Sequence, residues 1–188
     1  MVKLSEHNFR FKVTRINRRS IDKLVKLTDS YREDISETMR TFIQADEDLD
    51  TATFHSLVEF PALEFSLYAL AIIHCYSILE NNRKLICEGI RGISNSQKEN
   101  LYKIKIVEGV LKSINIAHTK LKCQKTMNEF REVNNAIKHN RFGLDTAITT
   151  KSQKKYEARQ LKGLYLNKAK YLESYLSDLF ERTKAQRL

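Results

Sequence analysis

Glycine, proline and tryptophan are scarce in this sequence. Its 188 residues include five glycines, one proline and no tryptophan. A fold built mainly from sheet needs glycine and proline at its many turns, so their scarcity argues against an all-β domain. Leucine, lysine, glutamate, isoleucine and alanine are common instead. The sequence therefore predicts an all-α fold.

Cysteine usage and apolar runs exclude further classes. The three cysteines, Cys75, Cys87 and Cys123, are an odd number without a Cys-x-x-Cys pair, so neither a disulfide framework nor a thiolate zinc site is expected. The longest apolar run, Leu67 to Ile73, is far shorter than the roughly 20 residues that span a bilayer. The N-terminus also lacks a signal pattern. We expect a cytoplasmic protein that does not enter a membrane.

Several catalytic signatures are also missing. The chain has no glycine-rich phosphate loop, no Gly-x-Ser-x-Gly elbow and no His-Glu-x-x-His pair. This argues against nucleoside triphosphatases, serine hydrolases and zinc enzymes. Internal repeats are absent, which argues against a solenoid. We expect no metal site and no cofactor.

Positive charge is in excess and unevenly distributed. The 33 basic and 23 acidic residues give a net charge of +10. Met1 to Ser20, Gln97 to Phe142 and Lys151 to Leu188 are positive, whereas Ile21 to Glu64 is negative. Such asymmetry is typical of a basic face that binds a polyanion such as RNA. The alternative is a scatter of solvated lysines.

Apolar residues recur every three or four positions in several segments, which is the spacing of one helix face. In the first long segment this stripe predicts a core-facing helix: Ile21, Leu24, Leu27, Tyr31, Ile35, Met39 and Phe42. Further helices are expected over 62–88, 101–121, 129–139 and 153–183. We predict one domain over residues 1–188, a single up-and-down bundle of about five helices with residues 1–19 as an N-terminal arm.

Three local features add detail to this predicted fold. In the arm, Phe9, Phe11 and Val13 alternate with polar residues, which indicates either a short strand that pairs near residues 147–150 or an extended arm on the bundle. Pro61 marks either a helix start or a kink. The acidic run at Asp46, Glu47, Asp48 and Asp50 is interpreted as a solvated loop rather than a metal site.

The segment from Glu129 to Arg141 has polar residues that solvation does not explain. On a helix, Phe130, Val133 and Ile137 form one apolar stripe, with Arg131, Asn134, Asn135 and Lys138 on the neighbouring flank. Two adjacent asparagines reduce helix stability because their amides compete for backbone hydrogen bonds. His139 falls near the helix end, where Asn140 and Gly143 are stop signals. We therefore expect a functional role for this segment.

The Asn-Asn-Ala-Ile-Lys-His run at the end of a helix, in a small helical chain, resembles the HEPN (higher eukaryotes and prokaryotes nucleotide-binding) superfamily. The resemblance implies a metal-independent endoribonuclease, of the kind found in toxin–antitoxin and antiviral-defence systems. His139 matches the motif histidine and Asn135 the polar residue of the motif. Asn134 stands where the motif has an arginine, and Arg131 lies one turn earlier.

Metal-independent RNA cleavage requires proton transfer and positive charge near the phosphate. His139 would handle the proton, and Asn134 and Asn135 would orient phosphate or ribose. Arg131, Lys138 or Arg141 would supply the charge, with Asn140 beside them. Glu80 lies close to an apolar helix face and would support the site by pairing with Arg131 or Lys138. His74 and His118 are interpreted as structural core histidines.

One histidine per chain is few for both acid and base. The resemblance implies a homodimer with two motifs facing each other across a groove. The apolar 62–88 and 153–183 helices also favour a dimer. The alternative function is a non-catalytic helical module that binds RNA or a partner protein such as an antitoxin. In a third interpretation, Asn134 and Asn135 only form a polar network between helices.

Overall fold

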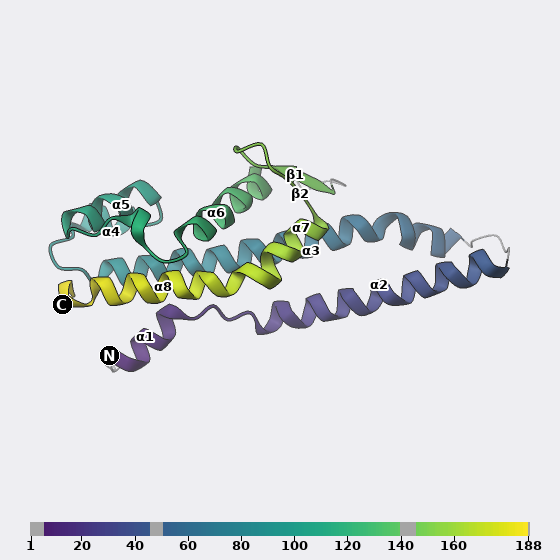
Figure 1. Cartoon of the computed structure of the whole chain (residues 1–188), viewed down its shortest axis with the longest axis horizontal. Coiled ribbons are helices and arrows are strands. Elements are labelled where there is room, and N and C mark those ends of the chain that lie inside the picture. Colours follow the sequence, from purple (N-terminus) through teal and green to yellow (C-terminus); the bar gives the residue numbers. More distant parts are fainter. Residues whose placement is uncertain (1–5, 46–50, 140–145, 188) are drawn as a thin grey trace. The chain divides into compact units, whose positions relative to one another are not determined.

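The computed structural model describes residues 6–45, 51–139 and 146–187, and it is mostly helical. The prediction of an all-α fold is confirmed. Besides short turns, the described elements in chain order are α1 (Glu6–Thr14), α2 (Arg19–Ala45), α3 (Thr51–Glu88), α4 (Asn95–Glu99), α5 (Ile104–Ser113), α6 (Gln124–His139), β1 (Ala147–Thr149), β2 (Lys155–Glu157), α7 (Ala158–Gly163) and α8 (Ala169–Thr183) (Figure 1).

The chain divides into two compact units. The first unit consists of Met1–Asn17, His74–Arg131 and Leu166–Leu188, and the second of Arg18–Ile73 and Glu132–Tyr165. Both α3 and α6 contribute residues to each unit. That residues 1–188 form one domain remains a prediction.

In the first unit, the N-terminal arm packs on the C-terminal helix. α1 lies along α8 (Figure 1), and the rings of Phe9 and Phe180 are 6.2 Å apart. Arg187, near the C-terminus, places its guanidinium carbon 4.7 Å from the centre of each ring. The core behind them is apolar and almost fully buried: Leu79 and Ile86 on α3, Val107 and Leu111 on α5, Phe130 on α6, and Leu172, Leu176 and Leu179 on α8.

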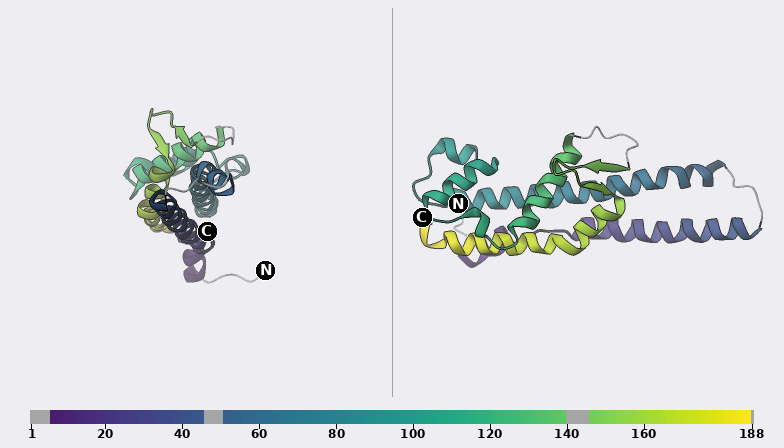
Figure 2. Two further views of the ribbon diagram at one scale, coloured as in Figure 1. Left: turned by 90° about the vertical axis from the view of Figure 1, so that its right-hand side faces the viewer. Right: turned by 45° about the horizontal axis from the view of Figure 1, so that its top comes forward.

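In the second unit, polar contacts join α2 to the first part of α3. Arg32 forms an ion pair with the buried carboxylate of Glu64, and the Tyr68 hydroxyl donates to Asp29 over 3.3 Å. The strands β1 and β2 form an antiparallel hairpin, which lies beside the C-terminal end of α6 (Figure 2). Ile148 faces Tyr156 across this hairpin, and both side chains are buried. The hairpin therefore has an apolar inner face.

The N-terminal arm is helical rather than extended. Residues 6–14 form α1, so the strand expected at Phe9, Phe11 and Val13 does not form. The segment near residue 147 pairs with Lys155–Glu157 instead. Residues four apart share a helix face, so Phe9 and Val13 both face inward while Phe11, between them, is 62% exposed.

The apolar stripe of α2 does not face a core, contrary to prediction. Leu24, Leu27, Tyr31 and Met39 are 46%, 67%, 44% and 38% exposed. The residues of α2 that do contact α3 and the helical segment after β2 are mainly charged: Asp22, Asp29 and Arg32. Val25 of α2 is nevertheless buried, and the Tyr31 ring packs edge-on against Phe60 with 5.5 Å between the ring centres. Leu24, Leu27 and Met39 are therefore the part of the stripe that faces outward.

Two predicted helices are shorter than expected. The helix expected over 101–121 ends at Ser113, because Asn115 takes a left-handed conformation (φ 63°). The amides of Ile116 and Asn115 then donate back to the carbonyls of Leu111 and Lys112, which closes the helix end. The last helix does not begin at Gln153, since Lys155–Glu157 is strand β2.

α3 is long and apolar, and it passes through Pro61 without ending. Its segment Glu59–Glu88 is long enough to cross a membrane by length and composition, with 50% of its most apolar window buried inside the protein. One such helix is weak evidence for a membrane span, because a core helix of a soluble protein can have the same length and composition. His74, on the same helix, is exposed rather than in the core, with Nε2 3.3 Å from the Asn17 carbonyl oxygen.

Candidate functional site

The C-terminal half of α6 presents three of the predicted site residues to solvent. Asn135, Lys138 and His139 are exposed, and their spacing of three and four residues places them on one flank. α6 ends at His139, so Lys138 and His139 lie in the last turn, where the helix dipole favours positive charge. An imidazole and an ammonium group therefore lie together at an exposed helix end. Asn140 and Arg141 lie outside the described residues.

The opposite face of α6 fixes the position of this flank. Phe130, Val133 and Ile137 are 0%, 0% and 2% exposed, which confirms the predicted apolar stripe. The hairpin adds one contact, because the Ser152 hydroxyl donates to Glu132 Oε2 over 2.7 Å. The exposed end of α6 is therefore held by packing on one side and by the hairpin on the other.

The two adjacent asparagines have different environments. Asn135 is exposed, whereas Asn134 is 1% exposed and its Oδ1 has no hydrogen-bond partner among the described residues. A buried amide oxygen without a partner costs about 1–3 kcal/mol. In the single chain, Asn134 is thus enclosed by protein rather than presented to a ligand.

Arg131 lies on α6 one turn before the exposed residues and belongs to the first unit. Burial raises the pKa of Tyr76, and the positive charges of Arg83 and Arg131 counteract this rise. Arg131 also helps to lower the pKa of His118, after burial, the main cause. The charge of Arg131 therefore acts on the buried groups of the first unit.

Glu80 does not have the partner that we predicted. It forms its ion pair with Arg83, one turn along α3, with 3.7 Å between Oε1 and Nη2. The described structure shows no ion pair between Glu80 and Arg131 or Lys138. Residues three apart on a helix are close neighbours, so the pairing within α3 forms without tertiary contacts.

Arg83 is the central residue of a buried polar cluster in the first unit. Its side chain is 0% exposed, and Nη2 donates to the Tyr102 carbonyl oxygen over 3.4 Å. Its Nε and Nη1 have no hydrogen-bond partner among the described residues. Burial opposes the charged form, but Tyr175, Tyr76 and Glu80 together raise the pKa of Arg83. Arg83 therefore remains a buried cation.

His118 joins this cluster from the short helical turn His118–Lys120 and is 4% exposed. Its Nε2 is 3.1 Å from the Tyr175 hydroxyl, and its Nδ1 is 3.3 Å from Glu108 Oε1 without a well-aligned hydrogen bond. Burial lowers the pKa of His118, although Glu108 favours its charged form. Burial therefore favours the neutral ring, whose Nε2 shares a hydrogen bond with the Tyr175 hydroxyl.

The cluster has the properties of a structural site rather than a catalytic one. Burial raises the pKa of the Cys87 thiol to about 12 and raises that of the Tyr175 hydroxyl well above its ordinary range. Both groups stay protonated at neutral pH, so neither is an activated nucleophile. His118 borders a cavity of about 500 Å³ whose walls include Glu108 and Lys112. The interpretation of His118 as a structural core histidine agrees with its burial.

Sequence reasoning missed Arg83, although a signal was present. The buried positions of α3 recur at Ile72, Tyr76, Leu79 and Ile86, and Arg83 falls in the same series. An arginine on the apolar stripe of a central helix implies buried polar partners.

Metal ligands do not gather in the described part of the chain. No three His, Cys, Asp or Glu side chains lie close enough there to hold an ion. The acidic run at Asp46, Glu47, Asp48 and Asp50 lies outside the described residues.

Comparison with protein-family models, with curated proteins and with solved structures finds no match to this chain. The functional argument therefore depends on the residues and their geometry.

Proposed function

We propose that the protein is a metal-independent endoribonuclease of HEPN type. The observation that carries this proposal is the exposed end of α6, where His139, Lys138 and Asn135 share one flank. The resemblance of the Asn-Asn-Ala-Ile-Lys-His run to the HEPN motif and the net charge of +10 support it.

Each exposed group has a chemical role in this reaction. The ribose 2′-hydroxyl is the nucleophile, and His139 exchanges a proton with it or with the departing 5′-oxygen. Lys138 lies next to the imidazole in sequence and stabilises negative charge on the phosphate, with Arg131 as the second cation. Asn135 donates from its amide to phosphate or ribose. In this arrangement Asn134, which is buried, does not contact RNA.

The proposal includes a homodimer, since cleavage needs both an acid and a base. Two copies of His139 across a two-fold axis would supply them. The exposed apolar stripe of α2, where Leu27 and Leu24 are 67% and 46% exposed, is one surface that favours self-association. Leu63 and Leu70 on α3, which are 59% and 52% exposed, are another.

The test is cleavage of single-stranded RNA by the purified protein in EDTA. We expect cleavage by the parent and loss of about 10² to 10⁴ in rate for His139→Ala. His74→Ala, which removes another exposed histidine, is the matched control and should cleave like the parent. Intact RNA with the parent, or equal cleavage by His139→Ala, would sink the enzyme proposal.

The second candidate is a non-catalytic helical module that binds RNA or a partner protein such as an antitoxin. The observation that favours it is the burial of Asn134 at the position where the HEPN motif has an arginine. This function predicts RNA binding that weakens with salt, without cleavage. Alternatively, it predicts a stable complex with a partner and no RNA affinity. We propose a cytoplasmic setting for either function, in a toxin–antitoxin or antiviral-defence system.

A further inference from the structure

A groove runs between α1 and α8 in the first unit, and its cavity measures about 690 Å³. Contacts along both helices hold its sides in place. Phe9 packs against Phe180, Arg10 pairs with Glu181 at 3.1 Å, and the Ile16 amide donates to Glu173 over 3.0 Å. The groove is therefore a fixed feature of the docked arm.

The acidic residues of the groove are already paired. Glu181 is bound by Arg10, and Glu173 lies 3.4 Å from Arg15. Asp178 accepts from Arg182 over 2.9 Å and from the Lys122 backbone amide over 3.0 Å. These contacts leave little free negative charge on the groove walls.

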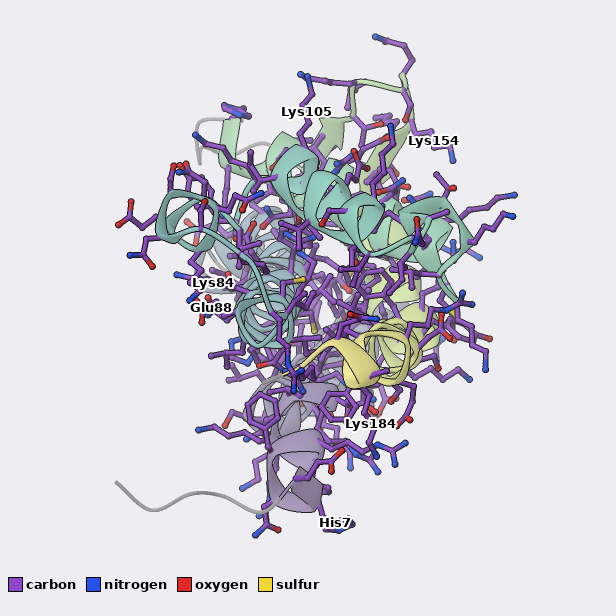
Figure 3. All side chains as sticks on the ribbon, turned by 90° about the vertical axis from the view of Figure 1, so that its left-hand side faces the viewer. His7, Lys84, Glu88, Lys105, Lys154 and Lys184 are labelled. Atoms are coloured by element: carbon purple, nitrogen blue, oxygen red, sulfur yellow. The ribbon has the colours of Figure 1, made fainter. Side chains whose placement is uncertain are left out.

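Two lysines of the groove remain available. Lys122 and Lys170 both line the cavity and are exposed, and neither forms an ion pair among the described residues. Lys170 Nζ lies 5.4 Å from the centre of the Tyr171 ring. His7, in the first turn of α1, also lines the cavity, and Figure 3 labels it. The floor adds the hydroxyls of Ser174 and Ser177. The groove thus offers positive charge and neutral hydrogen-bonding groups to an anion.

An exposed aromatic ring lies in the same groove. Phe11 is 62% exposed, and the Arg15 guanidinium carbon is 5.6 Å from its ring centre. α1 packs on the first unit through Val13 and through the contact of Phe9 with Phe180, and the Phe11 ring lies outside that packed face. Aromatic rings between cations are the usual platform for unpaired bases, which stack on the ring while the cations follow the backbone.

We propose that this groove binds single-stranded RNA, with one base stacked on Phe11 and the adjoining phosphates near Lys122 and Lys170. The choice of RNA rests on the proposed function, but the inference concerns binding and not cleavage. Unpaired bases are required, because a base inside a duplex cannot reach the Phe11 ring. A duplex or an acidic protein would use only the charges.

The experiment measures fluorescence anisotropy with a short labelled 2′-O-methyl oligouridylate, in which the 2′-oxygen cannot act as nucleophile. Phe11→Ala should weaken binding about fivefold to about a hundredfold, the effect of losing one base–aromatic stack. Phe11→Tyr should bind like the parent. The double variant Lys122→Gln, Lys170→Gln should reduce the slope of log affinity against log salt by about 1.4, or 0.7 for each lost phosphate contact.

Matched controls lie elsewhere on the first unit. Tyr102 is 51% exposed with Lys103 over its ring at 5.3 Å, so Tyr102→Ala removes a similar ring outside the groove. Lys103→Gln with Lys105→Gln repeats the charge change. Figure 3 shows Lys105 on the side of the unit opposite to His7. All variants should melt within a few degrees of the parent, since each side chain is exposed.

The outcomes separate this inference from the nuclease proposal. If Phe11→Ala binds like the parent and like Tyr102→Ala, the groove does not stack bases and the inference is wrong. An effect of the lysine variant alone, or equal binding of a duplex, would show a general polyanion surface and would also overturn it. Groove-dependent binding without cleavage of unmodified RNA would support the inference and remove the nuclease function. Cleavage of unmodified RNA together with binding that the groove variants do not weaken would support the nuclease function and overturn this inference.

Discussion

At the scale of single residues, His118 connects protonation to folding. Its ring lies among Glu108, Tyr175, Arg83 and Arg131, and burial lowers its pKa below the ordinary value of about 6.5. The unfolded chain therefore takes up the proton more readily than the folded chain. The contribution of the neutral His118 ring to the free energy of unfolding is complete above about pH 6.5. It is lost as pH falls through the folded-state pKa of this ring.

We predict that the free energy of unfolding decreases between about pH 7 and about pH 5, and that His118→Gln makes this decrease smaller. Urea unfolding of the parent and the variant at several pH values measures this pH dependence. His74→Gln, which replaces an exposed histidine of the same unit, is the control. Parallel curves for the parent and His118→Gln would contradict the prediction.

Asn134 provides a second prediction for a single residue. Its buried Oδ1 has no partner among the described residues, so an apolar side chain of similar size should suit the site better. Asn134→Leu is expected to raise the free energy of unfolding by about 1–3 kcal/mol in chemical denaturation. Asn135→Leu changes an exposed neighbour and should shift it by less than about 0.5 kcal/mol.

The outcome for Asn134→Leu also bears on function. A more stable but inactive variant would show that the amide is kept for the site at the cost of stability. A less stable variant would mean that Oδ1 has a partner in the working protein, as it would across a dimer.

At the scale of elements, the attachment of α1 depends on Arg187. The guanidinium lies 4.7 Å from the rings of Phe9 and Phe180 and donates to the Ile86 carbonyl oxygen over 3.1 Å. Two cation–π contacts and one hydrogen bond favour this position, while the buried Nε, which has no partner among the described residues, opposes it, so the net contribution is about 1–2 kcal/mol. Arg187→Ala should lower the free energy of unfolding by about that amount and expose α1 to limited proteolysis, whereas Arg159→Ala, at an exposed site, should do neither.

The elements also show which structural features can be predicted from sequence patterns. The α6 stripe of Phe130, Val133 and Ile137 was predictable because helical period and burial agree. The alternation of Phe9, Phe11 and Val13 was misleading, since residues 9 and 13 share a face in a strand and in a helix alike. Only the contact with Phe180, over 170 positions away in sequence, selects the helix.

The candidate site was predictable to a similar degree. Sequence spacing indicates that Asn135, Lys138 and His139 share a flank, and the structure agrees. Sequence spacing does not indicate that Asn134, only one residue away, is buried. Whether a helix flank is core or surface depends on the tertiary neighbours of that helix. The pairing of Glu80 with Arg83 was missed for a different reason, since a partner on the same helix was not considered.

At the scale of the whole molecule, the exposed apolar residues of α2 favour contact with a second protein surface. Leu24, Leu27 and Met39 follow one side of the helix and remain exposed, next to the Tyr31 ring that packs against Phe60. Exposed apolar stripes of this kind mark association sites in soluble proteins. We predict a dimer with twice the 22.0 kDa mass of the chain, measured by light scattering at micromolar concentrations.

Leu27→Glu tests both the dimer and its role in cleavage. A carboxylate placed in an apolar interface loses its water without gaining a partner, which costs several kcal/mol, so this variant should be a monomer with unchanged helix content. Ser36→Glu adds the same charge at an exposed position nine residues further on, on the opposite side of α2, and should remain dimeric. If two copies of His139 share one cleft, the Leu27→Glu monomer should also lose cleavage. A monomer that cleaves at the parental rate would show that one His139 is sufficient, and a parent that is monomeric at high micromolar concentration would remove the dimer altogether.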